Sequence, residues 1–403
     1  MGLHGRRHPV SGALDGIRIL DLSRFIAGPL CTQILGDMGA EVIKVERPGG
    51  EDARAQGARY RGESIYTMAY NRNKFGITLD TRHPAAGGLL ERLFRVSDVV
   101  VENYRPGTLE AMGFGADRLR EIAPRLIVTS LSGFGQTGPL AGRALFDPIA
   151  QATSGLMRLT GEADGPPTLV GTYIADHLAA LYGTIGTLVA LHARERTGEG
   201  QMVDVASLDA LFASLGTRPL ESSMLGTAAP RGGSRDPFSA PANVFPTVDG
   251  LVYIHGGTDS LFPRLCAAIG CAELAEDERY RDVPSRLDAA ADLESVVAGW
   301  TATRTVAEVS DALEGAGVPF GLVDDVAGAA RSPQLAAREM LIQIEHPVLG
   351  PLTVTGIPAK LTRTPGSVRK APPTVGEDND HVYGTILGMT STEIDDLRSS
   401  GAI

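Results

Sequence analysis

Short apolar runs alternate with stretches of helical spacing in the first third of the chain. Apolar runs that predict buried strands lie at residues 16–21, 41–46, 77–80, 98–102 and 126–130. Between them, the spacing of the apolar residues predicts helices over 29–38, 83–96 and 117–122. Strands separated by helices pair in parallel, because each helix returns the chain to the same end of the sheet. The pattern predicts an α/β fold with a doubly wound, Rossmann-like large domain.

The longest predicted helix covers residues 172–196. Its large apolar side chains recur at i, i+3, i+4 and i+7, which is typical of a stripe that faces a core. The residues predicted to be buried in this stripe are Leu178, Leu181, Tyr182, Ile185, Leu188, Val189 and His192. Gly183 and Gly186 would let another helix approach closely. A second apolar helix is predicted over 203–215.

Glycine, proline and serine are concentrated over residues 225–241, as in a linker. We therefore predict a large α/β domain over 1–215, a second, smaller α+β domain over 225–325, and a segment over 330–403 that returns to the large domain. The elements predicted after the linker are a strand at 251–255, helices at 261–269, 288–300 and 391–400, and a strand and turn over 344–357.

Composition excludes several classes of function. The net charge of -11, without a run of Lys or Arg, argues against nucleic acid as a partner. No stretch approaches the 18 or more apolar residues of a membrane span, so no membrane partner is expected. The first ten residues lack the apolar core and cleavage site of a secretory signal, and we therefore expect a cytoplasmic protein.

The three cysteines, Cys31, Cys266 and Cys271, show neither a disulfide framework nor metal-ligand spacing with nearby histidines. We expect them to be small buried residues and expect no metal.

The segment Gly133-Phe-Gly-Gln-Thr-Gly138 matches the G-x-G-x-x-G pattern of dinucleotide-binding proteins. Its context differs from theirs, because Pro139 and Gly142 interrupt the helix that should follow, and because the pattern belongs after the first strand. We interpret the segment as a flexible loop beside an active site.

A series of blocks along nearly the whole chain carries a family resemblance. The central blocks are Gly171-Thr-Tyr-Ile-Ala-Asp176 and Arg196-Thr-Gly-Glu-Gly-Gln201, and further blocks are Gly36-Asp-Met-Gly-Ala-Glu-Val-Ile-Lys-Val-Glu46, Asn73-Lys74, Val101-Glu-Asn-Tyr-Arg-Pro-Gly107 and Phe146-Asp-Pro-Ile-Ala-Gln-Ala152. In this order they resemble the class III CoA-transferases (formyl-CoA transferase, CaiB/BaiF type), a family that also includes the α-methylacyl-CoA racemases. The resemblance implies an enzyme that moves CoA between carboxylic acids, with acyl-CoA as co-substrate, and an interlocked homodimer.

Asp176 lies at the predicted start of the longest helix. Free N–H groups and the helix dipole favour a negative charge there, so we expect this carboxylate to be ionised at neutral pH. An ionised carboxylate can act as a covalent nucleophile, whereas position alone is more typical of an acid that only caps the helix. The resemblance implies that Asp176 attacks the thioester and then carries CoA as an aspartyl thioester. His177 points about 100° away around the helix and is interpreted as a packing or surface residue.

The resemblance also implies a CoA site, whose members are Ile26, Ala27, Arg47, Asn73, Lys74, Asn103, Tyr104, Arg105, Ala144, Phe146 and Asp147. Arg47 and Lys74 have the chemistry of phosphate contacts. Lys74 is also one of only four lysines among the 37 basic residues, which favours a specific role. At Ala111 the chain departs from the family, which often has a basic residue there. Candidate oxyanion donors are Gly256, Gly257 and Gly135, because glycine permits close backbone approach.

The racemase branch needs a histidine in the segment that corresponds to Arg143–Asp147, and this chain has none there. Proton abstraction and return would lack one of its two groups, which favours a transferase. A CoA-binding protein without activity is the remaining alternative. The polar loop Arg231-Gly-Gly-Ser-Arg235 and His255 favour short dicarboxylates, such as succinate, oxalate or malate, as substrates.

Overall fold

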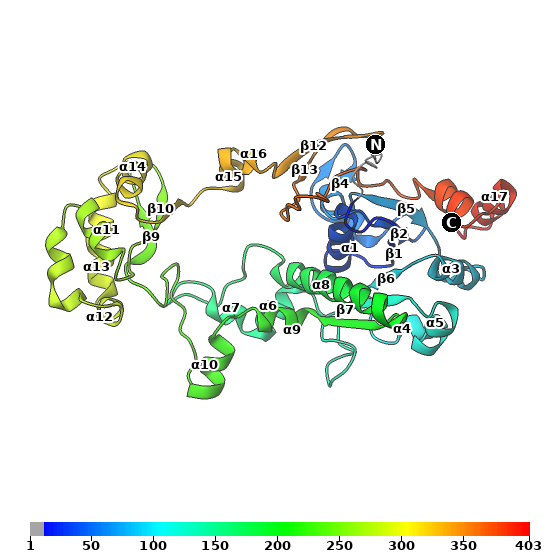
Figure 1. Ribbon diagram of the computed structural model, residues 1–403, viewed down its shortest axis with the longest axis horizontal. Helices are drawn as coiled ribbons and strands as arrows, with labels where there is room; N and C mark the ends of the chain where they lie inside the picture. Colours follow the sequence, from blue (N-terminus) through cyan, green and yellow to red (C-terminus); the bar gives the residue numbers. More distant parts are fainter. Residues whose placement is uncertain (1–11) are drawn as a thin grey trace, which may run out of the picture. The chain divides into compact units, whose positions relative to one another are not determined.

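The computed structural model describes residues 12–403 and divides the chain into two compact units (Figure 1). The large unit comprises the residues up to Leu156, Val170–Leu220 and Ala337–Ile403. The smaller unit comprises Met157–Leu169 and Glu221–Ala336. The smaller unit thus includes a short segment that the sequence assigned to the large domain. The N-terminal segment on which the expectation of a cytoplasmic location partly rests lies outside the described residues.

A six-stranded parallel sheet forms the centre of the large unit. Its strands are β1 (Arg18–Asp21), β2 (Glu41–Glu46), β5 (Lys74–Thr78), β6 (Val99–Glu102), β7 (Ile127–Ser132) and β8 (Met202–Ala206). They lie in the order β5-β2-β1-β6-β7-β8. Because the order reverses between β1 and β6, the loops that follow these two strands diverge and leave a crevice at the carboxyl ends of the strands. The predicted parallel α/β sheet is confirmed.

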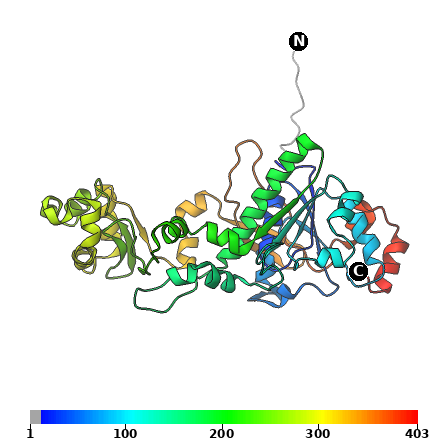
Figure 2. The same cartoon turned by 90° about the horizontal axis from the view of Figure 1, so that it is seen from below.

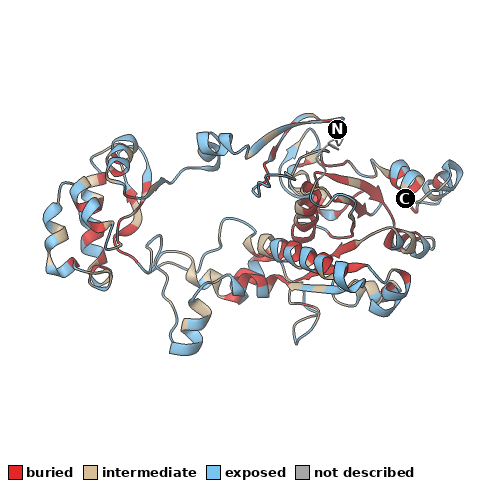
Figure 3. Cartoon of the chain, in the orientation of Figure 1, coloured by how far each residue is buried: buried red, intermediate tan, exposed pale blue. Residues whose placement is uncertain are grey.

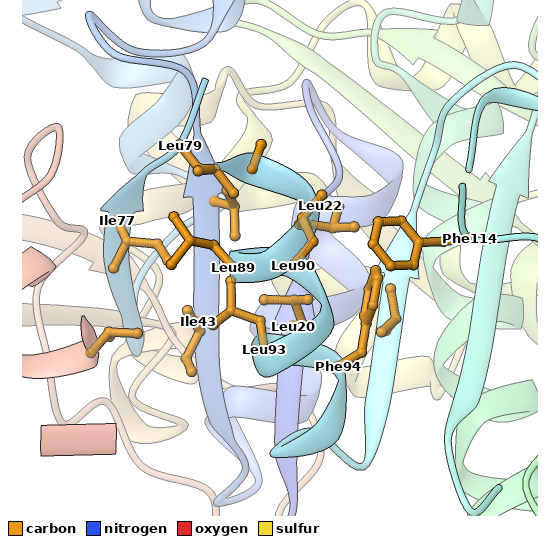
Figure 4. Close-up of a cluster of buried hydrophobic side chains, with 14 of the residues drawn as sticks. Leu20, Leu22, Ile43, Ile77, Leu79, Leu89, Leu90, Leu93, Phe94 and Phe114 are labelled. Atoms are coloured by element: carbon orange, nitrogen blue, oxygen red, sulfur yellow. The ribbon is translucent and has the colours of Figure 1, made fainter. Parts of the chain in front are cut away.

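Alternating side chains of the strands supply a core on each face of this sheet. Leu20 and Ile43 point to one face, where side chains of α3 (Ala86–Arg95) pack against them (Figure 4). Helix α5 (Ala116–Ile122) adds Leu119 and Ile122 to the same core. Their sequence neighbours Ile19 and Val42 point to the other face, beneath α1 (Ala27–Asp37) and α8 (Ile174–Thr197). The period of two in a strand thus buries consecutive apolar residues in separate layers.

The C-terminal segment belongs to the large unit. The turn of π-helix at Asp380–Ile386 and helix α17 (Ser391–Ser399) add Val382, Tyr383 and Ile394 to the core beneath α3. The remaining elements of this unit are β3 (Arg59–Tyr60), β4 (Glu63–Ser64), α2 (Ile65–Met68), α4 (Thr108–Ala111), α6 (Asp147–Ser154), α9 (Ser207–Ala213), β12 (Leu341–His346), β13 (Gly350–Thr355) and the 3-10 turn Asp52–Ala55. Helices α7 (Leu156–Leu159), α10 (Arg218–Leu225) and α16 (Pro333–Ala337) lie where the chain passes between the units.

Helix α8 lies on the sheet through its small residues (Figure 2). Ala179, Ala180 and Gly183 are buried, and a Cβ atom at Gly183 would lie only 2.8 Å from Leu131 Cδ2. The predicted buried stripe is therefore wrong: its large members Leu181, Tyr182, Ile185, Leu188 and Val189 are 39–61% exposed (Figure 3). Helical spacing identifies a stripe, but the face with the smaller side chains is the one that can approach a sheet closely.

Helix α8 is also long and apolar enough, by length and composition, to cross a membrane. This corrects the expectation that no stretch approaches a membrane span. The physical reason is that both sides of the helix contribute to its mean hydropathy: Ala and Gly on the buried side, and large apolar residues on the exposed side. Because 44% of the apolar window is buried inside the protein, the core position of the helix accounts for part of this composition.

The helix predicted over 203–215 is a strand followed by a helix. Met202–Ala206 pairs with β7 as the edge strand β8, and α9 begins only at Ser207. A short apolar run is ambiguous between helix and strand, and here the free edge of β7 decided in favour of the strand.

In the smaller unit, helices cover an antiparallel sheet. Strands β9 (Ala242–Pro246), β10 (Leu251–His255) and β11 (Phe320–Leu322) lie in the order β11-β10-β9. The helices are α11 (Phe262–Ala268), α12 (Val283–Asp288), α13 (Ala290–Thr301), α14 (Val306–Ala316) and α15 (Val326–Ala330), with 3-10 turns at Ala272–Glu276 and Glu278–Tyr280. The core beneath the helices contains Phe245, Val252, Leu265, Val297 and Leu313. The predicted strand at 251–255 and the two predicted helices are confirmed.

Candidate active site

A cavity of about 550 Å³ opens at the crevice between the loops of β1 and β6, entirely within the large unit. Its wall consists of residues that follow β1 (Arg24–Ala27), β6 (Asn103–Pro106) and β7 (Leu131–Gly133), of Arg143–Pro148 at the start of α6, of Tyr173 and Asp176 at the start of α8, and of Tyr66, Thr108, Ala141 and Ser207. A cavity of this size at the point where the strand order reverses is the usual ligand site of an open parallel sheet.

Asp176 lines this cavity from the first turn of α8. Tyr173, the residue that precedes the helix, offers no side-chain cap, and a residue from α6 takes that role. The Oδ2 atom of Asp147 accepts hydrogen bonds from the N–H groups of Ala175 at 2.6 Å and Asp176 at 3.2 Å. The carboxylate of Asp147 thus occupies the place at the helix start that the sequence assigned to the charge of Asp176.

Burial and the nearby charge of Asp147 together raise the pKa of Asp176 to about 7. The expectation of a carboxylate that is fully ionised at neutral pH is therefore wrong. The helix start favours a negative charge, but Asp147 already uses the free N–H groups there, so Asp176 feels burial and a like charge instead. A carboxylate that titrates near neutrality in a cavity wall is typical of a catalytic group.

Aromatic rings surround the start of α8. Tyr66 packs edge-to-face against Tyr70 and Tyr173, with ring centroids 5.9 and 6.3 Å apart. The hydroxyl of Tyr70 lies 3.3 Å from Nε2 of His177, and burial lowers the pKa of this histidine. His177 is therefore a half-buried packing residue turned toward Tyr70, in agreement with its interpretation from the sequence.

Of the eleven residues predicted to bind CoA, eight line the cavity: Ile26, Ala27, Asn103, Tyr104, Arg105, Ala144, Phe146 and Asp147. Their contact with CoA stays a prediction. The side-chain amide of Asn103 exchanges two hydrogen bonds with the backbone of Arg24, at 2.8 and 2.7 Å. Asn103 thus ties together the loops of β1 and β6 across the point where the strand order reverses.

The other three, Arg47, Asn73 and Lys74, do not line the cavity. Arg47 is exposed and pairs with Asp52 at 2.6 Å. The amide of Asn73 is buried and donates to Asp37 and to the carbonyl oxygen of Ser367, each at 2.8 Å.

The ammonium group of Lys74 is fully buried. It lies 2.9 Å from Oδ2 of Asp21 and donates to the carbonyl oxygen of Pro29 at 2.8 Å and to Asn71 at 2.9 Å. Asp21 in turn accepts hydrogen bonds from Ser23, in the loop after β1. The rarity of lysine did indicate a specific role, but the structure gives Lys74 a role inside the protein: it holds the loop that forms one wall of the cavity.

Phe25 has a left-handed backbone conformation (φ 65°) that costs free energy for a bulky residue. Its N–H group donates to Glu51 at 3.1 Å, and its ring meets that of Phe146 edge-to-face at 6.3 Å. Phe146 is 64% exposed and belongs to the segment Arg143–Asp147, which has no histidine. Among the residues described, no histidine lines the cavity.

The glycines predicted to bind an oxyanion lie in different units. Gly135 has φ 86°, and the N–H group of the next residue, Gln136, donates to Asp204 at 3.0 Å. In the smaller unit, the N–H group of Gly256 donates to the carbonyl oxygen of Pro241 at 3.0 Å, so it is not a free donor. The carbonyl oxygen of Gly257 accepts from Arg286 at 3.0 and 3.1 Å. The cavity wall contains Gly133 from the same loop as Gly135.

Several cavity residues were not predicted from the sequence. Arg24 and Arg143 add positive charge, and the hydroxyl of Ser132 is buried in the wall without a hydrogen-bond partner among the described residues. Ser132 ends β7, and its position at the carboxyl end of a central strand is the signal that could have identified it. From residue 12 onward, no group of three or more His, Cys, Asp or Glu side chains is arranged to hold a metal ion.

A cavity at the strand-order reversal of a parallel sheet, with a titratable carboxylate and several arginines in its wall, is typical of an α/β enzyme that acts on an anionic ligand. Residues 14–379 match the model of CoA-transferase family III. The chain is 38% identical to succinyl-CoA–D-citramalate CoA-transferase of Chloroflexus aurantiacus over 97% of its own length and 98% of that protein. It is 33% identical to human succinyl-CoA:glutarate CoA-transferase, over 97% and 90% of the two chains.

Among solved structures, a CaiB/BaiF family protein from Brucella suis matches with a TM-score of 0.84 and 33% identity, over 93% of this chain and all of that one. The chain belongs to CoA-transferase family III and is a class III CoA-transferase.

Proposed function

We propose that this CoA-transferase moves CoA from succinyl-CoA, or a similar short acyl-CoA, to a short dicarboxylic acid through a covalent intermediate on Asp176. The observation that carries the proposal is the position of Asp176, which lines the cavity of a class III CoA-transferase from the first turn of α8. CoA acts as part of the co-substrate, and the residues of the cavity wall supply cations and backbone groups for its phosphates.

The proposed reaction has four balanced steps. An Asp176 oxygen attacks the thioester carbonyl carbon, and the CoA thiolate leaves a mixed anhydride behind. The thiolate then attacks the Asp176 carbonyl carbon, which releases the donor acid as a carboxylate and leaves an aspartyl-CoA thioester. The carboxylate of the acceptor acid attacks this thioester and expels the thiolate again. Finally the thiolate attacks the acceptor's acyl carbon, which forms the new acyl-CoA and regenerates the Asp176 carboxylate.

The electrostatics of the site suit these steps. A pKa of about 7 makes Asp176 a stronger base than an ordinary carboxylate, and nucleophiles of higher basicity attack carbonyl carbons faster. The same value leaves a large share of the group ionised at the neutral pH at which it must attack. The rings of Tyr66 and Tyr173 in the cavity wall place apolar surface on the side of Asp176, which limits attack by water on the anhydride.

The proposed preference for dicarboxylates rests on arginines of the cavity wall and not on the loop Arg231–Arg235 that the sequence indicated. Arg235 pairs with Glu294 at 2.6 Å and Arg231 donates to backbone carbonyl groups, so both arginines of that loop have partners inside the smaller unit. Support comes instead from Arg24, Arg105 and Arg143 around the cavity and from relatives that are named for citramalate and glutarate. A second carboxylate needs a cation, which a pocket for a plain acyl chain does not.

Peptide mapping tests the covalent step. The protein is incubated with succinyl-CoA, treated with hydroxylamine or borohydride, digested and examined by mass spectrometry. The modified residue is expected to be Asp176, and Asp176→Ala should lose transfer by at least about 10³-fold, a typical cost for losing a nucleophile. Asp117→Ala, at an exposed position of α5, is the matched control and should remain active. A label on another residue would contradict the proposal.

A panel of acids tests the substrate class. Transfer of CoA from succinyl-CoA to malate, citramalate, glutarate and oxalate is compared with transfer to butyrate and octanoate. Higher kcat/KM is expected for the dicarboxylates. A preference for octanoate would contradict the proposed substrate class but would leave the proposed role of Asp176 unaffected.

We also propose a homodimer, as the family resemblance implied. Its support is the exposed apolar face of α8, formed by Leu181, Tyr182, Ile185, Leu188 and Val189. A contiguous apolar face of this kind on a soluble protein usually marks an interface. A second copy of the chain is the proposed occupant.

A further inference from the structure

Asp147 is built into the start of α8 although it belongs to α6. Both of its oxygens accept hydrogen bonds: Oδ2 from the N–H groups of Ala175 and Asp176, and Oδ1 from Nε2 of Gln151 at 2.5 Å. All three partners are donors, as an ionised carboxylate requires. Asp147 is only 2% exposed, so its charge lies in a medium that screens it poorly.

Gln151, one turn further along α6, extends this arrangement to the segment that leads into α8. Its Oε1 atom accepts from the N–H group of Val170 at 2.9 Å, and its Nε2 atom also lies 3.3 Å from the carbonyl oxygen of Thr172. The place of Asp176 in the cavity therefore depends on two side chains of α6, one charged and one neutral.

The charge of Asp147 acts directly on Asp176. Burial is the larger cause of the raised pKa of Asp176, and the charge of Asp147 is the second; from residue 12 onward no cation counteracts these two causes. His177 does not offset the charge, because burial lowers its pKa and keeps it neutral at pH 7. Among residues 12–403, the other titratable or charged side chains near Asp176 or around the same cavity are Tyr66, Tyr70, Tyr104, Tyr173, Arg24, Arg105 and Arg143.

We propose that Asp147 is a positioning residue of the transfer reaction, which holds the first turn of α8 through its N–H groups and places a negative charge beside the Asp176 carboxylate. The inference rests on the proposed role of Asp176 as the nucleophile. It assigns to Asp147 a task other than the CoA contact that the resemblance implied.

The test is the pH dependence of transfer from succinyl-CoA by the full chain. Asp147→Asn and Asp147→Thr both keep an oxygen that can accept a backbone N–H group but lose the charge. Only ionised Asp176 attacks, so the rate rises with pH through the pKa of Asp176. Both variants should move this acid limb to lower pH by about one unit, since removal of a nearby like charge favours the charged form. Gln151→Ala, the matched control, should slow transfer and leave the acid limb in place.

The outcomes separate this inference from the proposed function. If the label still maps to Asp176 but neither uncharged variant moves the acid limb, the role of Asp147 is wrong and the nucleophile stands. If the wild-type label maps elsewhere, the nucleophile itself is wrong. Thermal melting shows whether the variants are folded. Should both unfold, the wild-type profile decides: an acid limb near the ordinary value of 3.8 would overturn the inference, and one near 7 would support it.

Discussion

At the level of single residues, Asp176 shows how tertiary surroundings can reverse a local electrostatic effect. The start of a helix favours a carboxylate, by roughly 0.3–1 kcal/mol in exposed cases. At Asp176 the N–H groups already serve Asp147, and burial dominates. The chain therefore carries an acid whose ionisation opposes folding, as expected of a site selected for chemistry.

Replacement of Asp176 by Asn should stabilise the protein at high pH. Because the pKa rises from 3.8 to about 7 on folding, the folded state binds the proton more tightly, and the resulting stability is full below pH 3.8 and lost as pH rises through 7. Asp176→Asn avoids this loss. We expect its free energy of unfolding to exceed that of the wild type by about 2–4 kcal/mol at pH 8 and by little at pH 4.

Urea unfolding at the two pH values, at one protein concentration, measures this difference. Asp117→Asn is the control, because the side chain of Asp117 is 93% exposed and its replacement removes a carboxylate from the surface rather than from the cavity wall. An equal change in stability at pH 4 and pH 8 would show that the ionisation of Asp176 is not the cause.

Lys74 and Asn73 show that the chemistry of a residue type does not by itself identify its partner. A lysine in a chain rich in arginine has a distinctive chemistry, and phosphate binding was a reasonable prediction. The partners of Lys74, however, are Asp21 at the end of β1, the carbonyl oxygen of Pro29 in the first turn of α1, and Asn71. Only the packed structure shows that these groups surround the ammonium and bury it.

At the level of elements, α8 carries the proposed nucleophile Asp176, and it packs on the sheet with the side opposite to the one predicted. Its small residues Ala179, Ala180 and Gly183 lie on the sheet, which brings the helix axis close to β7 and places Asp176 at the cavity. The large residues on the opposite side remain exposed in the single chain. The periodicity predicted the extent of the helix within about two residues but assigned the wrong side to the core.

The close approach at Gly183 can be tested by adding one methyl group. In Gly183→Ala the new Cβ atom would lie 2.8 Å from Leu131 Cδ2, in a core where Leu131 is only 3% exposed. Overpacking of this kind typically costs about 1–3 kcal/mol, which outweighs the higher helix propensity of alanine. We expect a lower unfolding midpoint in urea and, because α8 shifts, weaker transfer activity.

Gly299→Ala in α13 is the matched control. Nothing lies within 4 Å of a Cβ atom at that position, so alanine should be neutral or stabilise the helix by about 0.5–1 kcal/mol. If Gly183→Ala behaves like this control, the small-residue contact does not limit the position of α8.

At the level of the whole molecule, the exposed face of α8 bears on the state of assembly. Ile185 and Val189 are 55% and 61% exposed at the centre of that face. If a second copy of the chain covers them, the wild type should sediment as twice its mass of 42.3 kDa. Ile185→Glu should then shift the protein toward the monomer at micromolar concentration, since a charge buried in an apolar interface is costly.

Analytical ultracentrifugation of wild type, Ile185→Glu and Val348→Glu provides the measurement. Val348 is 71% exposed in the turn between β12 and β13, and its replacement should leave the mass unchanged. A monomeric wild type, or a dimer that tolerates Ile185→Glu, would contradict the proposed use of this face. The cytoplasmic location stays a prediction, because it rests partly on residues outside the described chain.

Much of the architecture follows from local sequence alone. The apolar run at 41–46 coincides with β2, and the alternation of strands and helices predicted the parallel sheet, because periods of 2 and 3.6 residues are properties of the backbone. The ordered blocks around Asp176 pointed to a CoA-transferase. These are short-range patterns, and a single chain carries them whether or not it is folded.

Tertiary structure decided the rest, because each remaining feature depends on residues far apart in the sequence. Met202–Ala206 forms a strand because it pairs with the edge of β7. The side of α8 that carries small residues packs on the sheet because it can approach the sheet more closely. Asp147, 29 residues before Asp176, accepts the free N–H groups at the helix start, and its charge helps to raise the pKa of Asp176. Burial and charge act through space, so no pattern along the chain encodes their sum at one carboxylate.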